Sequence, residues 1–237
     1  MYNIFITLFI LLLILLNFKN SIYNIETFNN DVYDKINIIY YINLKERTDR
    51  NKDFLDEMNK LDLPISKIQR IDAIKHYRGE VGCSYSHIKT LEEFIQSSYN
   101  NCIIFEDDFS FSVSKDEFTN LLDQVFINNI DYDVIMLSGS IIDKIPSNYD
   151  FLDKVIEGQT ASGYLVSKKF AKNLLDNYIE SVQLLENNSV DKYEIYGLDQ
   201  YWKKLQPNNN WYVFNPKVGY QRESFSDIHK VVVSYNV

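Results

Sequence analysis

The sequence predicts a single α/β domain with a mostly parallel, twisted sheet flanked by helices. Short apolar runs of strand length alternate with longer segments in which apolar residues recur at helical spacing. This alternation is typical of a parallel sheet with helices on both faces, because parallel strands need long crossover connections. The chain has 237 residues, 46% of them hydrophobic, which suits one domain with a substantial core.

The first predicted unit is a strand followed by a helix and a second strand. The run 36–42 is rich in β-branched and aromatic residues and predicts a buried strand. Thr48 or Asp49 is expected to cap the helix that follows, which should end before Pro64. A short second strand is expected over 67–71.

The rest of the chain continues the alternation. We expect Ser84 or Ser86 to cap a second helix, because apolar residues recur at helical spacing after them. The apolar run 102–105 predicts a strand that stops at three acidic residues, and Ser114 with Glu117 forms a capping-box pattern for the next helix. Two further strands and one helix are expected at 134–137, at 164–166 and after Ser167.

Charge and cysteine content exclude several classes of protein. The formal net charge is −9, from 24 basic and 33 acidic side chains. Such an acidic chain is a poor candidate for binding nucleic acid through phosphates, and a better one for holding a metal with carboxylates. The two cysteines, Cys83 and Cys102, cannot build a disulfide framework and lack the spacing of a zinc site. A single bridge between them is left open.

The N-terminus predicts a membrane or export segment. Residues 1–18 contain no charged side chain, a length at the low edge for a membrane span. A cleaved signal peptide and a buried helix are the alternatives, but no small-x-small cleavage site follows. We therefore predict an anchor or signal segment at 1–20, a linker at 21–34 and the functional domain at 35–237, in a protein that is membrane-anchored or enters the secretory pathway.

The strongest chemical signal is the acidic triplet Glu106-Asp107-Asp108, directly after a predicted strand. Ligands of open α/β sheets bind at the carboxyl ends of the strands. Mn²⁺ and Mg²⁺ prefer carboxylate and phosphate oxygens, and Glu106 and Asp108 alternate so that both can reach one ion. The alternative is a solvated acidic turn.

Two further segments are candidates for binding an anion. Arg47 and Arg50 lie three residues apart after the first predicted strand, so one helical turn can present both to a phosphate. Gly82 to His87 is expected to open a helix, where backbone N–H groups bind anions and a glycine permits close approach. A pair of surface arginines and a plain helix cap are the respective alternatives.

Two late segments carry isolated candidates. Asp199, at the expected start of a helix, is a candidate general base, although an acidic residue there also simply favours the helix dipole. Asp227 and His229 share a face if their segment is extended, and either is a candidate metal ligand.

Taken in order, these motifs resemble glycosyltransferase family 25, which includes bacterial lipooligosaccharide and collagen galactosyltransferases. The resemblance extends from Ile36 to His229. The motifs that carry it are Tyr41-Ile42-Asn43-Leu44 with Arg47 and Arg50, Gly82-Cys83 with Ser86-His87, and Ile104-Phe105-Glu106-Asp107-Asp108. Shorter matches follow at Asp133-Val134-Ile135, Gly163-Tyr164, Leu198-Asp199 and Ser226-Asp227-Ile228.

The resemblance implies a GT-A-like fold and an inverting transfer from a UDP-sugar, UDP-galactose or UDP-glucose, with Mn²⁺ or Mg²⁺. It also implies an acceptor hydroxyl on a glycan, as in lipopolysaccharide biosynthesis, or on a protein. The implied roles are metal binding by Glu106, Asp108 and His229, donor binding by Asn43, Arg47, Arg50, Gly82, His87 and Asp107, and general base catalysis by Asp199. The alternatives are a degenerate member that binds nucleotide sugar or glycan without turnover, and an acidic interaction domain without a donor site.

Overall fold

The computed structural model describes residues 32–189, 192–225 and 232–233. Within these ranges, no helix combines the length and the apolar character that crossing a bilayer requires. The anchor or signal segment predicted at 1–20 and the candidate ligand His229 lie outside the described residues.

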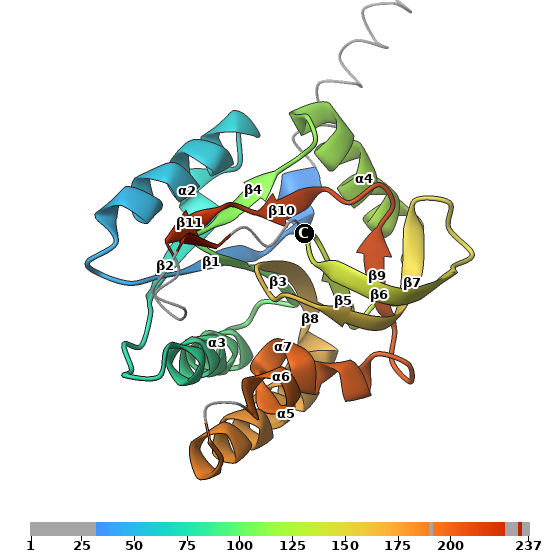
Figure 1. Ribbon diagram of the computed structural model, residues 1–237. Helices are drawn as coiled ribbons and strands as arrows, with labels where there is room; N and C mark the ends of the chain where they lie inside the picture. Colours follow the sequence, from blue (N-terminus) through green and yellow to red (C-terminus); the bar gives the residue numbers. More distant parts are fainter. Residues whose placement is uncertain (1–31, 190–191, 226–231, 234–237) are drawn as a thin grey trace, which may run out of the picture.

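An eight-stranded sheet forms the centre of the molecule (Figure 1). All its strands except β7 and β8 run in the same direction, so the mostly parallel sheet predicted from the sequence is confirmed. In spatial order the strands are β2 (Ile68–Asp72), β1 (Ile38–Asn43), β3 (Asn101–Glu106), β8 (Gly163–Ser167), β5 (Val134–Met136), β9 (Trp211–Phe214), β7 (Leu152–Gln159) and β6 (Ser140–Pro146). Two-stranded sheets are formed by β4 (Phe109–Phe111) with β10 (Gly219–Gln221) and by β11 (Ser224–Phe225) with β12 (Val232–Val233).

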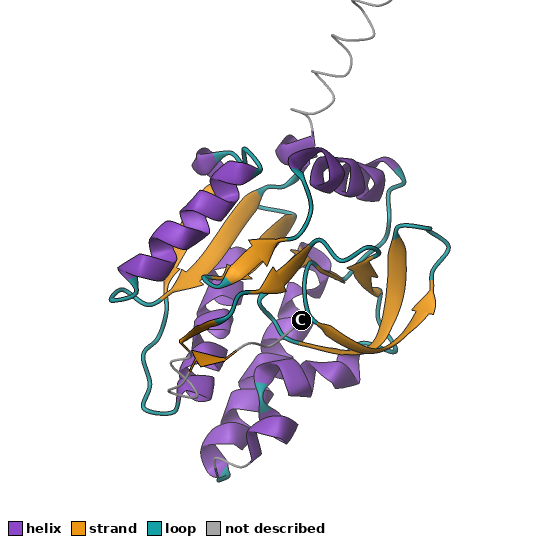
Figure 2. Ribbon diagram, turned by 45° about the horizontal axis from the view of Figure 1, so that its top comes forward, coloured by secondary structure: helices purple, strands orange, loops and turns teal. Residues whose placement is uncertain are grey.

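Helices cover both faces of the sheet, as the alternating pattern predicts (Figure 2). Along β1, Ile39 and Tyr41 pack with α2 and α4, whereas Ile38 and Tyr40 pack with α3 and α5, because successive side chains of a strand point to opposite faces. The helices are α2 (Thr48–Lys60), α3 (Gly79–Gln96), α4 (Lys115–Ile127), α5 (Lys168–Asn187), α6 (Tyr193–Tyr196) and α7 (Leu198–Tyr201), with 3₁₀ turns η1 (Ile65–Lys67) and η3 (Trp202–Leu205).

Most predicted elements are present close to their expected positions. The capping box at the start of α4 is confirmed, with Ser114 and Glu117 each bonding the backbone N–H of the other. The hairpin of β6 and β7 was not predicted. Most of β6 is exposed, so its sequence lacks the apolar run that marks a buried strand.

The expected start of α3 is wrong. The helix begins at Gly79, and Ser84 and Ser86 are buried inside it, each donating its hydroxyl to the carbonyl four residues earlier. Gly82 therefore does not open the helix. A Cβ at this glycine would lie 2.5 Å from the carbonyl oxygen of Ile74, so the glycine permits close contact between α3 and the chain that precedes it.

Lys168, at the start of α5, fixes the other end of α3. Its ammonium group donates to the carbonyl oxygens of Phe94, Ile95 and Ser97 at 2.6, 2.8 and 2.8 Å. The last carbonyls of a helix have no partner within the helix and carry its negative dipole end, so a cation stabilises them.

We expect Lys168→Met to lower the free energy of unfolding by about 2 kcal/mol, because it removes three charge-assisted hydrogen bonds and keeps the apolar stem. Lys172→Met, on the surface of the same helix, is the matched control. It removes an exposed pair with Asp176 and should cost under about 0.5 kcal/mol. Urea unfolding measures both, and equal stabilities of the two variants would contradict this role of Lys168.

Candidate functional site

The acidic triplet lies at the carboxyl edge of the sheet, where β1 and β3 end side by side. These strands are parallel, and Ile42 pairs with Glu106. The residues at the ends of the two strands therefore lie in contact: the side-chain amide of Asn43 donates to a carboxylate oxygen of Asp107 at 2.6 Å. The structure thus joins two motifs that are distant in the sequence.

Arg50, in the first turn of α2, is the cation that faces the triplet. Its guanidinium lies 2.8 Å from a carboxylate oxygen of Asp107 and 3.2 Å from one of Asp108. All three side chains are largely buried. Asn43 and Arg50, both predicted to bind the donor, therefore hold Asp107 in place, and their contact with a donor stays a prediction.

Two residues from late in the chain, which the sequence did not predict, also bind the acidic triplet. Arg222 donates to the backbone carbonyls of Asp107 and Asp108, in each case at 2.8 Å. The side-chain amide of Gln221 donates to the Asp108 carboxylate at 3.2 Å. Gln221 ends the three-residue strand β10 and Arg222 follows it. Neither belongs to a motif, so only the pairing of β10 with β4 brings them to the site.

Asp108 carries an unfavourable charge in this environment. Burial and the neighbouring Glu106 charge raise its pKa from 3.8 to about 7, although Arg50 opposes the shift. One oxygen, Oδ1, is buried and accepts no hydrogen bond from the residues that the structure describes. An excess of buried carboxylate with an unused oxygen fits a divalent cation, and Glu106 and Asp108 are the residues that would hold it.

Glu106 is anchored from α3. Nε2 of His87 lies 3.1 Å from its carboxylate, and the Cys83 thiol donates to the same oxygen at 3.5 Å. His87 is fully buried, and its Nδ1 is 2.9 Å from the Tyr164 hydroxyl. Both ring nitrogens of His87 thus have protein partners. Its predicted contact with a donor stays a prediction, and its visible role is to position Glu106.

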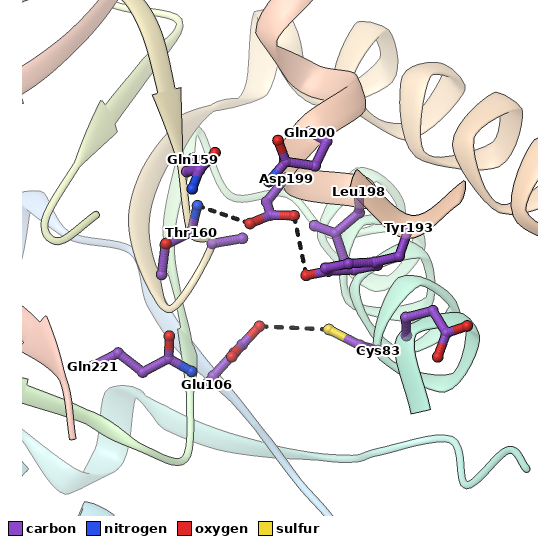
Figure 3. A pocket seen from close by; sticks show the side chains of 11 residues that line it. Cys83, Glu106, Gln159, Thr160, Tyr193, Leu198, Asp199, Gln200 and Gln221 are labelled. Atoms are coloured by element: carbon purple, nitrogen blue, oxygen red, sulfur yellow. Dashed lines mark hydrogen bonds between the residues drawn. The ribbon is translucent and has the colours of Figure 1, made fainter. Parts of the chain in front are cut away.

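Glu106 and Asp199 lie on opposite sides of one pocket (Figure 3). Asp199, in the first turn of α7, accepts a hydrogen bond from the backbone N–H of Thr160 at 2.9 Å, and the Tyr193 hydroxyl is 3.4 Å away. The other lining residues are Glu80, Cys83, Gln159, Ala161, Leu198, Gln200 and Gln221. Carboxylates, side-chain amides and one aromatic ring are suited to binding polyhydroxylated ligands.

The two pocket carboxylates differ in basicity. Burial and the Glu106 charge raise the pKa of Asp199, although the hydrogen bond from Thr160 opposes the shift. Burial also acts to raise the pKa of Glu106, but the hydrogen bond and charge of His87 outweigh it and lower that pKa. Opposite shifts in neighbouring groups are typical of catalytic sites, and Asp199 is the stronger base of the two.

Arg47 and the two cysteines are the remaining candidates from the sequence. Arg47 is at the start of α2, paired with Asp49 at 2.9 Å, and does not line the pocket. Cys83 and Cys102 are both free thiols. Burial raises the pKa of Cys83 well above its usual range, which disfavours the thiolate that a nucleophile requires.

The central part of the chain matches the model of a known protein family. Residues 77–192 match the model of glycosyltransferase family 25, described as an LPS biosynthesis protein. The resemblance predicted from the motifs is confirmed over this range, and it supports a glycosyltransferase. The matched range includes Cys83, His87 and the acidic triplet, whereas Arg50 and Asp199 lie outside it. A comparison with curated proteins finds no match.

Several solved structures resemble the chain loosely. A glycosyltransferase involved in glycosylation of the major capsid of PBCV-1 has a TM-score of 0.45 at 9% identity, over 81% of this chain and 95% of that one. A197 from STIV has a TM-score of 0.43 at 11% identity, over 84% and 95% of the two chains. Mannose-1-phosphate geranyltransferase from Thermus thermophilus has a TM-score of 0.43 at 8% identity, over 79% and 74%.

The raised pKa of Asp108 predicts a pH-dependent cost in stability for this domain. Between pH 4 and 7 the folded state binds a proton at Asp108 that the unfolded state has released, so stability falls as pH rises through this range. We expect Asp108→Asn to melt at a higher temperature than the wild type at pH 8, with the difference shrinking toward pH 4. Thermal melts across this range measure it. A lower melting temperature of the variant at pH 8 would contradict the unfavourable charge.

Proposed function

We propose that this chain transfers a hexose, galactose or glucose, from a UDP-sugar to a hydroxyl of a glycan or protein acceptor, with inversion and with Mn²⁺ or Mg²⁺. The family match supports the transferase class. The observation that carries the proposal is the pocket in which a carboxylate of raised pKa, Asp199, faces the acidic motif through Glu106.

Asp199 is the proposed base. An inverting transfer is a single in-line displacement, in which the acceptor oxygen bonds to the anomeric carbon as the bond to the diphosphate breaks. The Asp199 carboxylate takes the proton of the acceptor hydroxyl during this step. The backbone N–H of Thr160 fixes the carboxylate, and the raised pKa makes it a better proton acceptor.

The acidic edge is the proposed donor side. A bound divalent cation, held by Glu106 and Asp108, would neutralise charge that develops on the departing diphosphate. His87 and Cys83 hold Glu106 at the edge of the pocket, and Arg50 with Asn43 holds Asp107. The proposed donor contacts, with the nucleotide and its phosphates, are those of Asn43, Arg47, Arg50, His87 and Asp107, whereas Gly82 is buried against the chain at Ile74.

The acceptor side is the amide-lined part of the pocket, where Gln159, Gln200 and Tyr193 surround Asp199 (Figure 3). The family description names LPS biosynthesis, which favours a glycan acceptor over a protein one. If residues 1–20 anchor the chain to a membrane, the site is held near a membrane-bound acceptor. This location, and the third metal ligand His229, are parts of the same proposal.

A donor titration tests the proposal first. We expect UDP-galactose or UDP-glucose with Mn²⁺ to raise the melting temperature by about 5–10 °C at roughly 100 times the dissociation constant, because only the folded state binds the ligand. GDP-mannose, and UDP-sugars without a divalent ion, are the controls. No shift with any UDP-sugar would contradict the donor assignment, whereas a shift without transfer to any acceptor would favour the non-catalytic binder.

The base assignment is tested by Asp199→Asn. The amide oxygen still accepts the hydrogen bond from Thr160 but does not take a proton, so we expect transfer to fall about 10²–10⁴-fold while the donor-induced thermal shift is retained. Asp176→Asn, an exposed substitution on α5, is the matched control and should leave the rate unchanged. An unchanged rate in Asp199→Asn would move the base to another residue.

A further inference from the structure

Three potential metal ligands of different chemistry converge beside the acidic motif. Cys83, His87 and Glu106 each offer one atom, and these atoms all lie within 4.8 Å of one another. Cys83 and His87 are four residues apart and so share one face of α3, while Glu106 comes from the end of β3. Spacing in the sequence does not predict this group, because its third member comes from another element.

We propose that Cys83, His87 and Glu106 form a binding site for Zn²⁺, separate in ligand set from the Mn²⁺ or Mg²⁺ site of the proposed transferase and sharing only Glu106 with it. Thiolate and imidazole ligands favour zinc, whereas manganese and magnesium favour oxygen.

Two of the distances between the ligand atoms are close to those of a tetrahedral zinc site. The Cys83 sulfur lies 3.5 Å from the Glu106 oxygen, and His87 Nε2 lies 3.1 Å from the same oxygen. A tetrahedral zinc with Zn–S of about 2.3 Å and Zn–N and Zn–O of about 2.0–2.1 Å separates neighbouring ligand atoms by about 3.3–3.6 Å. All three ligand atoms lie within 4.8 Å of one another, so side-chain movement can close them around the ion, and Cys83 and Glu106 line the pocket from which a water could serve as fourth ligand.

The histidine is held as a metal ligand usually is. A ligating imidazole generally donates its second N–H to a fixed partner, which orients the ring. Here Nδ1 of His87 lies 2.9 Å from the Tyr164 hydroxyl, and the ring is stacked against Tyr164 with centroids 5.9 Å apart. As a zinc ligand, His87 would carry its proton on Nδ1 and turn the Nε2 lone pair to the metal, in place of its contact with Glu106.

The charge of the pocket also favours a cation. Glu80, Glu106 and Asp199 line it, and no lysine or arginine does so among the described residues. Glu80 is already paired with Arg78 at 2.8 Å, which leaves Glu106 and Asp199 to attract the ion. When zinc binds, the Cys83 thiol releases its proton to solvent and the sulfur bonds to the metal.

The site has a consequence for activity, which rests on the proposed function. A zinc ion that takes the carboxylate of Glu106 removes it from the donor metal and places positive charge opposite Asp199. Zinc would therefore inhibit transfer at concentrations at which manganese supports it, because a thiolate-containing site binds zinc far more tightly than manganese.

A cobalt titration of the metal-stripped full-length chain tests the binding directly, since Co²⁺ is the spectroscopic substitute for Zn²⁺. We expect thiolate-to-cobalt charge-transfer absorption that saturates at one equivalent and is abolished by one equivalent of Zn²⁺. Cys83→Ser should remove the absorption. Cys102→Ala is the matched control, because Cys102 is buried in β3 away from the cluster, and it should keep the absorption.

Tyr164→Phe gives a second measurement that does not alter a ligand. Loss of the hydroxyl removes the partner of His87 Nδ1, and we expect zinc affinity to fall about 10–100-fold. Absence of the charge-transfer band in the folded wild type, or its persistence in Cys83→Ser, would overturn the zinc site. The titration contains no sugar nucleotide, so a failure of the proposed transferase reaction leaves this result standing, and a missing band alongside manganese-dependent transfer removes the zinc site alone.

Discussion

The ion pairs between Arg50 and the two aspartates are the interaction on which the site depends. Burying a carboxylate is costly unless it is paired, and Asp107 and Asp108 are both buried at the ends of parallel strands. One guanidinium serves both, so α2 must start where its first turn faces the acidic motif. The strand register of β1 and β3 adds Asn43 beside Asp107. The compensation is incomplete, as the raised pKa of Asp108 shows, and an uncompensated buried charge is what a cation-binding site requires.

The sequence predicts well those features that have local causes. Alternating apolar runs predict the strands and the class of fold, and a capping box predicts the start of α4, because these signals lie within a few residues. The start of α3 escapes prediction because its first turn lies before the apolar pattern, and the serines that resemble caps bond backward inside the helix. The hairpin of β6 and β7 escapes because its outer strand is mostly exposed and has no buried face to mark it.

The same contrast between local and long-range causes applies to the residues of the site. The rule that ligands bind at the carboxyl ends of strands explains why the acidic triplet, which directly follows an apolar run, could be proposed as a site from the sequence. By contrast, the partners of Glu106 depend on how α3 packs on the sheet, and the contacts of Gln221 and Arg222 depend on a strand of three residues. Long-range packing decides which of the plausible polar residues touch one another. A motif therefore predicts the residues of the site better than it predicts their partners.

The electrostatics of the pocket also constrain how the proposed reaction would proceed. Glu106 and Asp199 raise the negative potential in the space where the acceptor hydroxyl would lie, and the donor diphosphate adds further negative charge. The charge of Glu106 raises the basicity of Asp199, which favours proton removal, but the two carboxylates together would repel the donor. Arg50 does not resolve this conflict, since it is already engaged by Asp107 and Asp108. A divalent cation held by Glu106 and Asp108 would resolve it, because its charge would offset the repulsion between these carboxylates and the diphosphate.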